Sequence, residues 1–241
     1  MTKASFQRYV RKAHRYLGVL LGIQFLFWTI GGLYFSWTKI EEVRGENLRK
    51  KESLVQPQEL TISLADVLPT LQADSISKLS VSYVLGEAHY QITYFQQGFE
   101  KITLIHAATG AIRKPLNESE AVEVAKQSFL QPTTVSSVAY ITKTNGHHEY
   151  REKPLPAYAV TLSQPGNTTV YVSAELGTVQ SYRNNTWRIF DFLWMLHIMD
   201  FENRDNINNW LLRAFSAFGL ITLLSGFTLY FITSRKIIFT K

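Results

Sequence analysis

The chain has 241 residues, of which 46% are hydrophobic and 13% aromatic, and its formal net charge is +6. It contains no cysteine, which excludes disulfides, covalent c-type haem attachment and iron–sulfur ligation, so a bound haem or metal would need His, carboxylate, Met or Tyr ligands. The basic residues flank apolar runs instead of forming an interior patch, which argues against nucleic-acid binding.

Two apolar runs, 17–37 and 214–233, contain no charged residue. At about 1.5 Å per residue, a helix of about 20 residues crosses a hydrocarbon core of about 30 Å. The first run is also longer than a signal-peptide core. We therefore predict transmembrane helices at 17–37 and 210–233, in contact with membrane lipid. Small residues in both runs favour close helix packing, although membrane helices are generally rich in glycine: Gly18, Gly22, Gly31, Gly32, Gly219, Ser225 and Gly226.

The charges beside these runs set the expected orientation. By the positive-inside tendency, the basic segment 1–16 and the tail 234–241 both lie in the cytoplasm. We therefore expect a protein of the bacterial inner membrane whose main domain is periplasmic. The basic residues behind this prediction are Lys3, Arg8, Arg11, Lys12, Arg15, Arg235, Lys236 and Lys241.

The region between the runs begins with a charged segment, 38–59, and then carries a weak internal duplication. We expect Lys39–Lys51 to continue the first helix as a stalk that ends before Pro57. Beyond it, Ile102–Gly110 resembles Thr169–Gly177, and each alternates like a strand and ends at a glycine turn. We predict two repeats, each a helix followed by a small antiparallel sheet. The repeats cover 60–116 and 117–186, and their helices Leu64–Leu71 and Glu118–Phe129.

Other alternating stretches predict further strands in both repeats. Asn145-Gly146 is typical of a tight hairpin turn. The strands are expected at Ser80–Tyr83, Tyr90–Tyr94, Val138–Thr142 and Ala157–Thr161.

Short motifs along the chain resemble one family. His106–Ile112 and Ser173–Val179 resemble the closing turn of the PepSY module. His14–Gly18 resembles the H-R-x-L-G opening of PepSY-associated transmembrane proteins, and Leu196–Leu229 resembles their closing segment. The resemblance implies an α+β membrane protein in which two transmembrane helices flank an extracytoplasmic tandem PepSY-like domain.

The resemblance also implies a class of activity. Some larger members of this family resemble haem-containing ferric or ferric-siderophore reductases, and shorter two-span relatives are associated with iron reduction. The larger members have four or more spans in one chain. With only two spans, a four-helix bundle that holds non-covalent haem b would need a homodimer or a larger membrane complex.

His14 lies just before the first apolar run, next to Arg15 and other basic residues. An axial haem ligand needs a neutral imidazole, apolar neighbours and cations near the propionates. Arg15 and its basic neighbours supply the cations, and Tyr16 and Leu17 supply apolar surface. We expect His14 to be a haem ligand; the alternative is an interfacial basic residue that helps to set topology.

His197 lies in the apolar stretch 187–201, which is too short to cross a bilayer. We expect an interfacial or re-entrant helix within 187–209, with His197 as a second axial ligand, because a buried imidazole at membrane depth is costly. The alternative is a core histidine that bonds to the backbone. In a helix, the residues on the face of His197 are Phe190, Leu193, Trp194 and Phe201.

The two histidines would hold haems near opposite membrane faces. If His197 stays at the outer surface, about 30 Å separates the two levels, so efficient transfer requires its helix to dip inward. Arg213 opens the second span and would neutralise a haem propionate or a nearby acid, or else simply snorkel. The acids considered are Asp200, Glu202 and Asp205.

Three more candidate ligands, His147, His148 and Glu149, follow the Asn145-Gly146 turn. On an exposed hairpin tip they could contact a ferric chelate. Adjacent strand residues point to opposite faces, however, so they make a poor closed metal site. His89 and His106 lie in strand-like positions, and we expect both to be structural.

No P-loop, dinucleotide fingerprint or hydrolase motif occurs in the chain. The electron donor, which the sequence does not identify, would then be another protein or a quinol. The leading hypothesis is haem-dependent membrane electron transfer that reduces ferric iron or a ferric chelate on the periplasmic side. The alternative is a non-catalytic PepSY accessory subunit of a larger membrane complex. Bound haem discriminates between the two.

Overall fold

The computed structural model describes residues 3–51, 54–165 and 167–234, and it divides into two units that are described separately. We call residues 1–39 and 189–241 the helical unit, and residues 40–188 the sheet unit. The basic residues Arg235, Lys236 and Lys241, on which part of the predicted orientation depends, lie outside the described residues.

The helical unit contains two long apolar helices, α1 (Lys3–Trp37) and α6 (Trp210–Ser234). Both are long and apolar enough to cross a membrane, which confirms two apolar helices near the ends of the chain. Almost none of their apolar side chains is buried; Phe231 is 63% exposed, for example. In water such faces would be unfavourable by about 25 cal/mol per Å². The helices therefore need an apolar environment or a partner.

A third helix, α5 (Asn185–Ile198), begins in the sheet unit and continues in the helical unit from Ile189. It coincides with the short helix predicted within 187–209. The left-handed backbone of Met199 (φ 56°) ends it, and an irregular loop leads on to α6.

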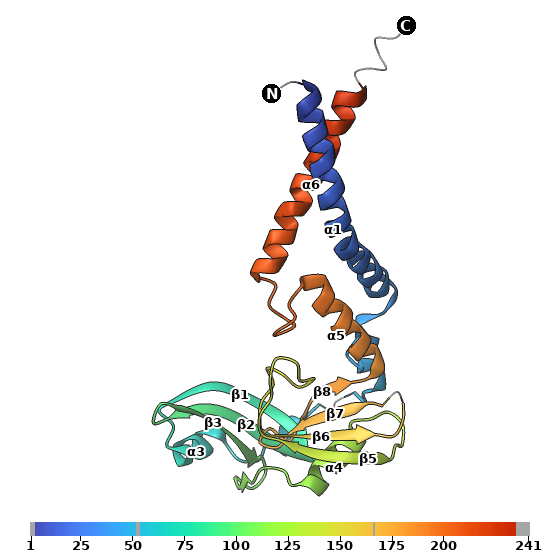
Figure 1. The fold of residues 1–241 in the computed structure, drawn as a ribbon. Helices are drawn as coiled ribbons and strands as arrows, with labels where there is room; N and C mark the ends of the chain where they lie inside the picture. Colours follow the sequence, from blue (N-terminus) through green and yellow to red (C-terminus); the bar gives the residue numbers. More distant parts are fainter. Residues whose placement is uncertain (1–2, 52–53, 166, 235–241) are drawn as a thin grey trace. The chain divides into compact units, whose positions relative to one another are not determined.

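The sheet unit contains two four-stranded antiparallel meanders, which confirms the two predicted small antiparallel sheets (Figure 1). Within each sheet, every strand pairs with its neighbour in sequence. The first repeat comprises α3 (Leu64–Val67), the 3₁₀ turn η3 (Leu68–Leu71), β1 (Ser75–Val84), β2 (Glu87–Gln96), β3 (Phe99–His106) and β4 (Ile112–Arg113). The second comprises α4 (Glu118–Gln127), β5 (Val135–Ile141), β6 (Ala157–Leu162), β7 (Thr169–Ser173) and β8 (Val179–Arg183).

The duplicated glycines occupy equivalent turns. Gly110 (φ 74°) and Gly177 (φ 66°) both adopt the left-handed conformation that glycine tolerates best. A Cβ on Gly177 would also lie 2.8 Å from Cγ1 of Val84. Val84 and Leu104 of the first sheet belong to the same buried cluster as α4 and the second sheet. The two repeats therefore share one core, and a second cluster packs α3 and η3 on the first sheet.

The expected helical stalk at Lys39–Lys51 is wrong. The helix α1 ends at Trp37, and only a single turn, α2 (Ile40–Val43), and a 3₁₀ turn, η1 (Glu46–Leu48), follow. Gly45 is left-handed and packs on Tyr182, so the chain turns there. The backbone N–H of Lys50 then donates to the Ser128 carbonyl (2.8 Å), and this pairing replaces a continuous helix.

The expected hairpin at Asn145-Gly146 is also wrong. The strands β5 and β6 do pair, but residues 142–156 form a long connection between them. The Asn145 side chain accepts a hydrogen bond from the backbone N–H of His147, which makes a local turn. Tyr150, further along the connection, is fully buried, so this segment folds back onto the sheet instead of reversing tightly.

Candidate cofactor site

Helix α5 packs along α1 through aromatic rings within the helical unit. Phe190, Trp194 and His197 recur at helical spacing on one face of α5, and their rings stack in sequence, with interplanar angles of 14° and 8°. From α1, Phe35 contacts all three, and Trp28 contacts His197 at 5.9 Å between ring centroids. We call these five residues the aromatic seam.

Two side chains of α1 fix the end of α5. Gln24 Nε2 donates to the Leu196 carbonyl, and Trp28 Nε1 donates to the His197 carbonyl, each at 2.7 Å. Asn209 Nδ2 donates to the next carbonyl, that of Ile198, at 2.8 Å. The last carbonyls of a helix have no partner inside it, and in apolar surroundings they need one. These three donors therefore hold the end of α5 at the level of Gln24 and Trp28.

The imidazole of His197 has an unused polar atom. Its Nδ1 is buried and has no hydrogen-bond partner among the described residues. The ring contacts Trp28, Phe35 and Trp194, with centroids 5.8–6.2 Å away. A buried ring nitrogen without a partner is costly, so a ligand or a proton acceptor is expected there. The alternative prediction was a core histidine whose ring bonds to the backbone, but no described backbone group bonds to His197 Nδ1.

The predicted face of α5 is largely present. Phe190 and Trp194 lie in the seam with His197 as expected. Phe201 does not share this face, because α5 ends at Ile198 and Phe201 lies in the following loop, about half exposed.

His14 of α1 contacts Ser225 of α6, and the two helices cross in Figure 1. Its Nδ1 is 2.8 Å from Ser225 Oγ. A Cβ on Gly226 would lie 3.2 Å from His14 Cε1, whereas one on Gly219 would meet nothing within 4 Å. Of the predicted small residues, Ser225 and Gly226 thus lie close to α1, and Gly31 lies close to α5, where a Cβ would be 3.9 Å from the Leu193 carbonyl oxygen. A Cβ on Gly18, Gly22 or Gly32 would meet nothing within 4 Å. Because Ser225 occupies Nδ1, Nε2 is the nitrogen that could ligate a metal.

The distance between the two histidine levels follows from positions along α1. Trp28, which bonds the His197 carbonyl, is fourteen residues after His14 (28 − 14). At about 1.5 Å per residue this is about 21 Å along the helix axis. The end of α5 therefore lies about 21 Å from the level of His14 along α1.

The predicted arginines lie at exposed positions. Arg15 places its guanidinium 5.3 Å from the centre of the Tyr16 ring. Arg213 forms no side-chain ion pair within the described part of the chain. Among its expected partners, Asp200 instead accepts four backbone N–H bonds from the loop that follows α5. Burial would raise the pKa of Asp200, but these donors outweigh it and lower the pKa below its usual range.

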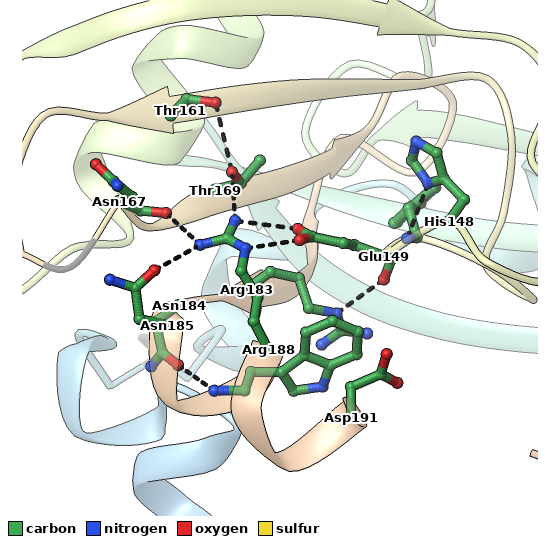
Figure 2. Close-up of polar contacts among 12 residues, drawn as sticks. His148, Glu149, Thr161, Asn167, Thr169, Arg183, Asn184, Asn185, Arg188 and Asp191 are labelled. Atoms are coloured by element: carbon green, nitrogen blue, oxygen red, sulfur yellow. Dashed lines mark hydrogen bonds and ion pairs between the residues drawn. The ribbon is translucent and has the colours of Figure 1, made fainter. Parts of the chain in front are cut away.

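Glu149 of the 142–156 connection is engaged in the sheet unit (Figure 2). Its two carboxylate oxygens accept from Arg188 Nε (2.6 Å) and Nη2 (3.1 Å). Its carbonyl accepts from Arg183 Nε (2.8 Å), and Tyr171 also donates to the carboxylate. Burial, then the nearby Glu149 charge, raises the pKa of Tyr171. Glu149 therefore anchors the connection.

His147 and His148, the other two predicted contacts for a ferric chelate, differ in exposure. His147 is exposed, while His148 accepts the Tyr150 N–H at Nδ1 (3.0 Å). Across the described residues, no group of three or more His, Asp or Glu side chains is arranged to hold a metal ion.

Several residues of this site escaped the sequence reasoning. Gln24 and Phe35 stand out in the sequence only as members of an uncharged run, and Trp28 only as a candidate interface anchor. Gln24 is the one with a usable signal, since a lone amide in an apolar run needs a hydrogen-bond partner. Trp28 and Phe35 carry no such signal, because aromatic residues are common in apolar helices.

No family model, no curated protein and no solved structure matches the chain.

Proposed function

We propose that the protein is a membrane oxidoreductase that reduces ferric iron or a ferric chelate on the periplasmic side, with His14 and His197 as axial ligands of non-covalent haem b. The observation that carries this proposal is His197, whose buried Nδ1 has no partner among the described residues, in an aromatic seam anchored to α1. The PepSY-like reading of the two repeats and the iron-reductase activity both come from the sequence resemblance.

Membrane insertion is supported by the outward-facing apolar side chains of α1 and α6. Lipid would cover these faces without a loss of stability, whereas water would not. With the basic residues before the first span in the cytoplasm, the sheet unit would lie in the periplasm of a bacterial inner-membrane protein.

The residues at both histidines fit a haem ligand. Haem b would supply a one-electron carrier, and ligation by two imidazoles favours electron transfer over oxygen chemistry. Ser225 orients the His14 ring through Nδ1 and leaves Nε2 available. Trp194 and Phe35 exclude water from the His197 ring. Arg15 and Arg213, both exposed and each next to an uncharged run, would neutralise propionates.

The stoichiometry implies a second chain. One chain supplies one histidine at each level, so paired ligation needs a homodimer, or another subunit of a larger complex. The exposed faces of α1 and α6 would supply the contact. His147 and His148 remain proposed contacts for the chelate, and the electron donor would be a separate protein or a quinol.

The direct test is the transfer of electrons from the reduced protein to iron. Detergent-purified protein is reduced with dithionite, desalted and mixed with ferric citrate, and ferrous iron is measured with a chromogenic chelator. We expect His197→Ala to lose at least 90% of this reduction and His106→Ala, a histidine outside the proposed site, to retain most of it. Equal reduction by the two variants would contradict the proposal. Folded wild-type protein that reduces no iron would favour the accessory-subunit alternative.

A further inference from the structure

A small pocket of about 260 Å³ lies in the first repeat and shares no residue with the sites described above. Its walls come from the end of β1, from the turn between β1 and β2, from the end of β3 and from the 3₁₀ turn η2 (Pro57–Glu59). The volume lies below the range of about 300–1,000 Å³ in which drug-sized ligands bind. We therefore expect a ligand of only a few heavy atoms.

The pocket is lined by two carboxylates, those of Glu59 and Glu87. Oε2 of Glu59 accepts hydrogen bonds from the Tyr83 hydroxyl and from the Gln56 N–H (3.3 Å). Oε2 of Glu87 lies 3.7 Å from His106 Nε2. Within the described chain these contacts leave Oε1 of each glutamate without a hydrogen bond, so each carboxylate can still accept one from a ligand.

The groups beside the carboxylates donate hydrogen bonds without adding a basic residue to the pocket. The Ala108 N–H donates to His106 Nδ1 (3.2 Å), so the neutral imidazole carries its proton on Nε2, which faces Glu87. The hydrogen bond to Glu59 raises the pKa of Tyr83, so that hydroxyl stays protonated. With histidine counted as neutral, the described lining residues carry a formal charge of −2 (two carboxylates, no basic residue).

The walls of the pocket are fixed by backbone geometry. Leu85 (φ 53°) and Gly86 (φ 85°) are both left-handed and form the tight turn that joins β1 to β2. The Ala107 N–H donates to the Ala88 carbonyl (2.8 Å), and the Ile62 N–H donates to the Ala107 carbonyl (3.0 Å). These bonds connect β2, the end of β3 and the segment after η2. A pocket that is already formed loses less free energy on binding than one that the ligand must order.

We propose that this pocket binds a small aliphatic diamine, with one ammonium group at Glu59 and the other at Glu87. Across the described residues, no three His, Asp or Glu side chains are arranged to hold one metal ion, so a ligand with two separate positive ends fits the two carboxylates better. A primary ammonium group donates up to three hydrogen bonds, and those to a carboxylate are strengthened by charge. Ala88 and Ala108 would contact the methylene chain. Diamine binding does not depend on haem or on iron reduction.

The test is calorimetric titration of the full-length protein in detergent with putrescine, at low salt, where exposed charges are least screened. Glu87→Gln keeps the shape of the side chain but removes its charge, and we expect it to weaken binding at least tenfold. Glu100→Gln on β3 makes the same change at an exposed position outside the pocket and should change affinity less than twofold. Circular dichroism checks that each variant is folded.

A second variant separates shape from charge. Ala108 lines the pocket from an exposed position, and Ala108→Trp would fill the space without altering charge. We expect it to weaken putrescine binding at least fivefold. 1,4-Butanediol, which has the same carbon chain but no charge, should not bind.

Three results would each overturn the proposal. The first is equal affinity of Glu87→Gln and Glu100→Gln for putrescine, and the second is no binding by the wild type at millimolar concentration. The third is equal affinity of the wild type for n-butylamine or Mg²⁺, because the proposal requires two ammonium groups on one chain.

Discussion

The sheet unit and the helical unit bury their apolar side chains to very different degrees. In the sheet unit, clusters around Val84, Ile92 and Tyr150 enclose large side chains completely. In the helical unit, most large apolar side chains of α1 and α6 face outward, and a few polar contacts join the helices. The sheet unit therefore carries its stability within itself, whereas the helical unit depends on its surroundings and on single hydrogen bonds.

The largest expected effect is at the shared core of the repeats. Gly177→Ala would place a Cβ 2.8 Å from Val84 and force alanine to φ 66°, so it should lower the free energy of unfolding by about 3 kcal/mol. Gly98→Ala is the matched control: it has the same left-handed strain (φ 79°) but no atom within 4 Å, and should cost about 1 kcal/mol. Urea unfolding followed by circular dichroism measures both. Equal losses would show that crowding at Val84 is unimportant.

The next effect concerns the Glu149 anchor. Arg188→Met removes the guanidinium that bonds both carboxylate oxygens of the half-buried Glu149. The free energy of unfolding of the sheet unit should therefore fall by about 2 kcal/mol. The control is Arg44→Met, whose exposed pair with Glu46 spans 3.9 Å and should contribute less than about 0.5 kcal/mol. The same unfolding measurement applies. If both variants match the wild type, Glu149 does not anchor the connection.

A smaller effect tests the end of α5 in the helical unit. Gln24→Leu removes the donor to the Leu196 carbonyl and should destabilise the last turn of α5 by about 1 kcal/mol. Amide hydrogen exchange in residues 190–200 should then accelerate about fivefold. Gln7→Leu makes the same change on α1, where Gln7 has no side-chain bond within the described residues. Unchanged exchange in Gln24→Leu would show that the Gln24 hydrogen bond does not stabilise the end of α5.

The smallest effect is a pH dependence in the sheet unit. His89 is buried, and burial lowers its pKa. The unfolded chain therefore binds a proton near pH 6.5 while folded His89 stays neutral, so stability is full above pH 6.5 and falls as the pH decreases towards the folded pKa. Thermal unfolding between pH 7.5 and 5.5 should show this fall, and His89→Gln should reduce it. The exposed His147→Gln is the control; an identical pH profile for all three proteins would contradict the assignment.

Features that depend on local sequence could be predicted, whereas features that depend on contacts between distant residues could not. The apolar runs, the duplicated glycine turns and the strand alternation predicted both helices and both sheets, because each signal is local. The segment after α1 was predicted wrongly because its pairing partner, Phe129, is eighty residues away (129 − 49). The connection after β5 was misread for the same reason, since Glu149 is held by Arg188. At the candidate site, the face of α5 that carries Phe190, Trp194 and His197 could be predicted, but the residues of α1 that pack against it could not.

The central claim is that the two histidines hold haem, and an oxidised-minus-reduced absorbance spectrum tests it most directly. Detergent-purified protein should show sharp b-type bands, with haem quantified per chain. His14→Ala and His197→Ala should each remove part of the signal, and the double variant should remove all of it, while His148→Ala keeps it. A featureless spectrum from folded wild-type protein, or full bands in the double variant, would contradict the account.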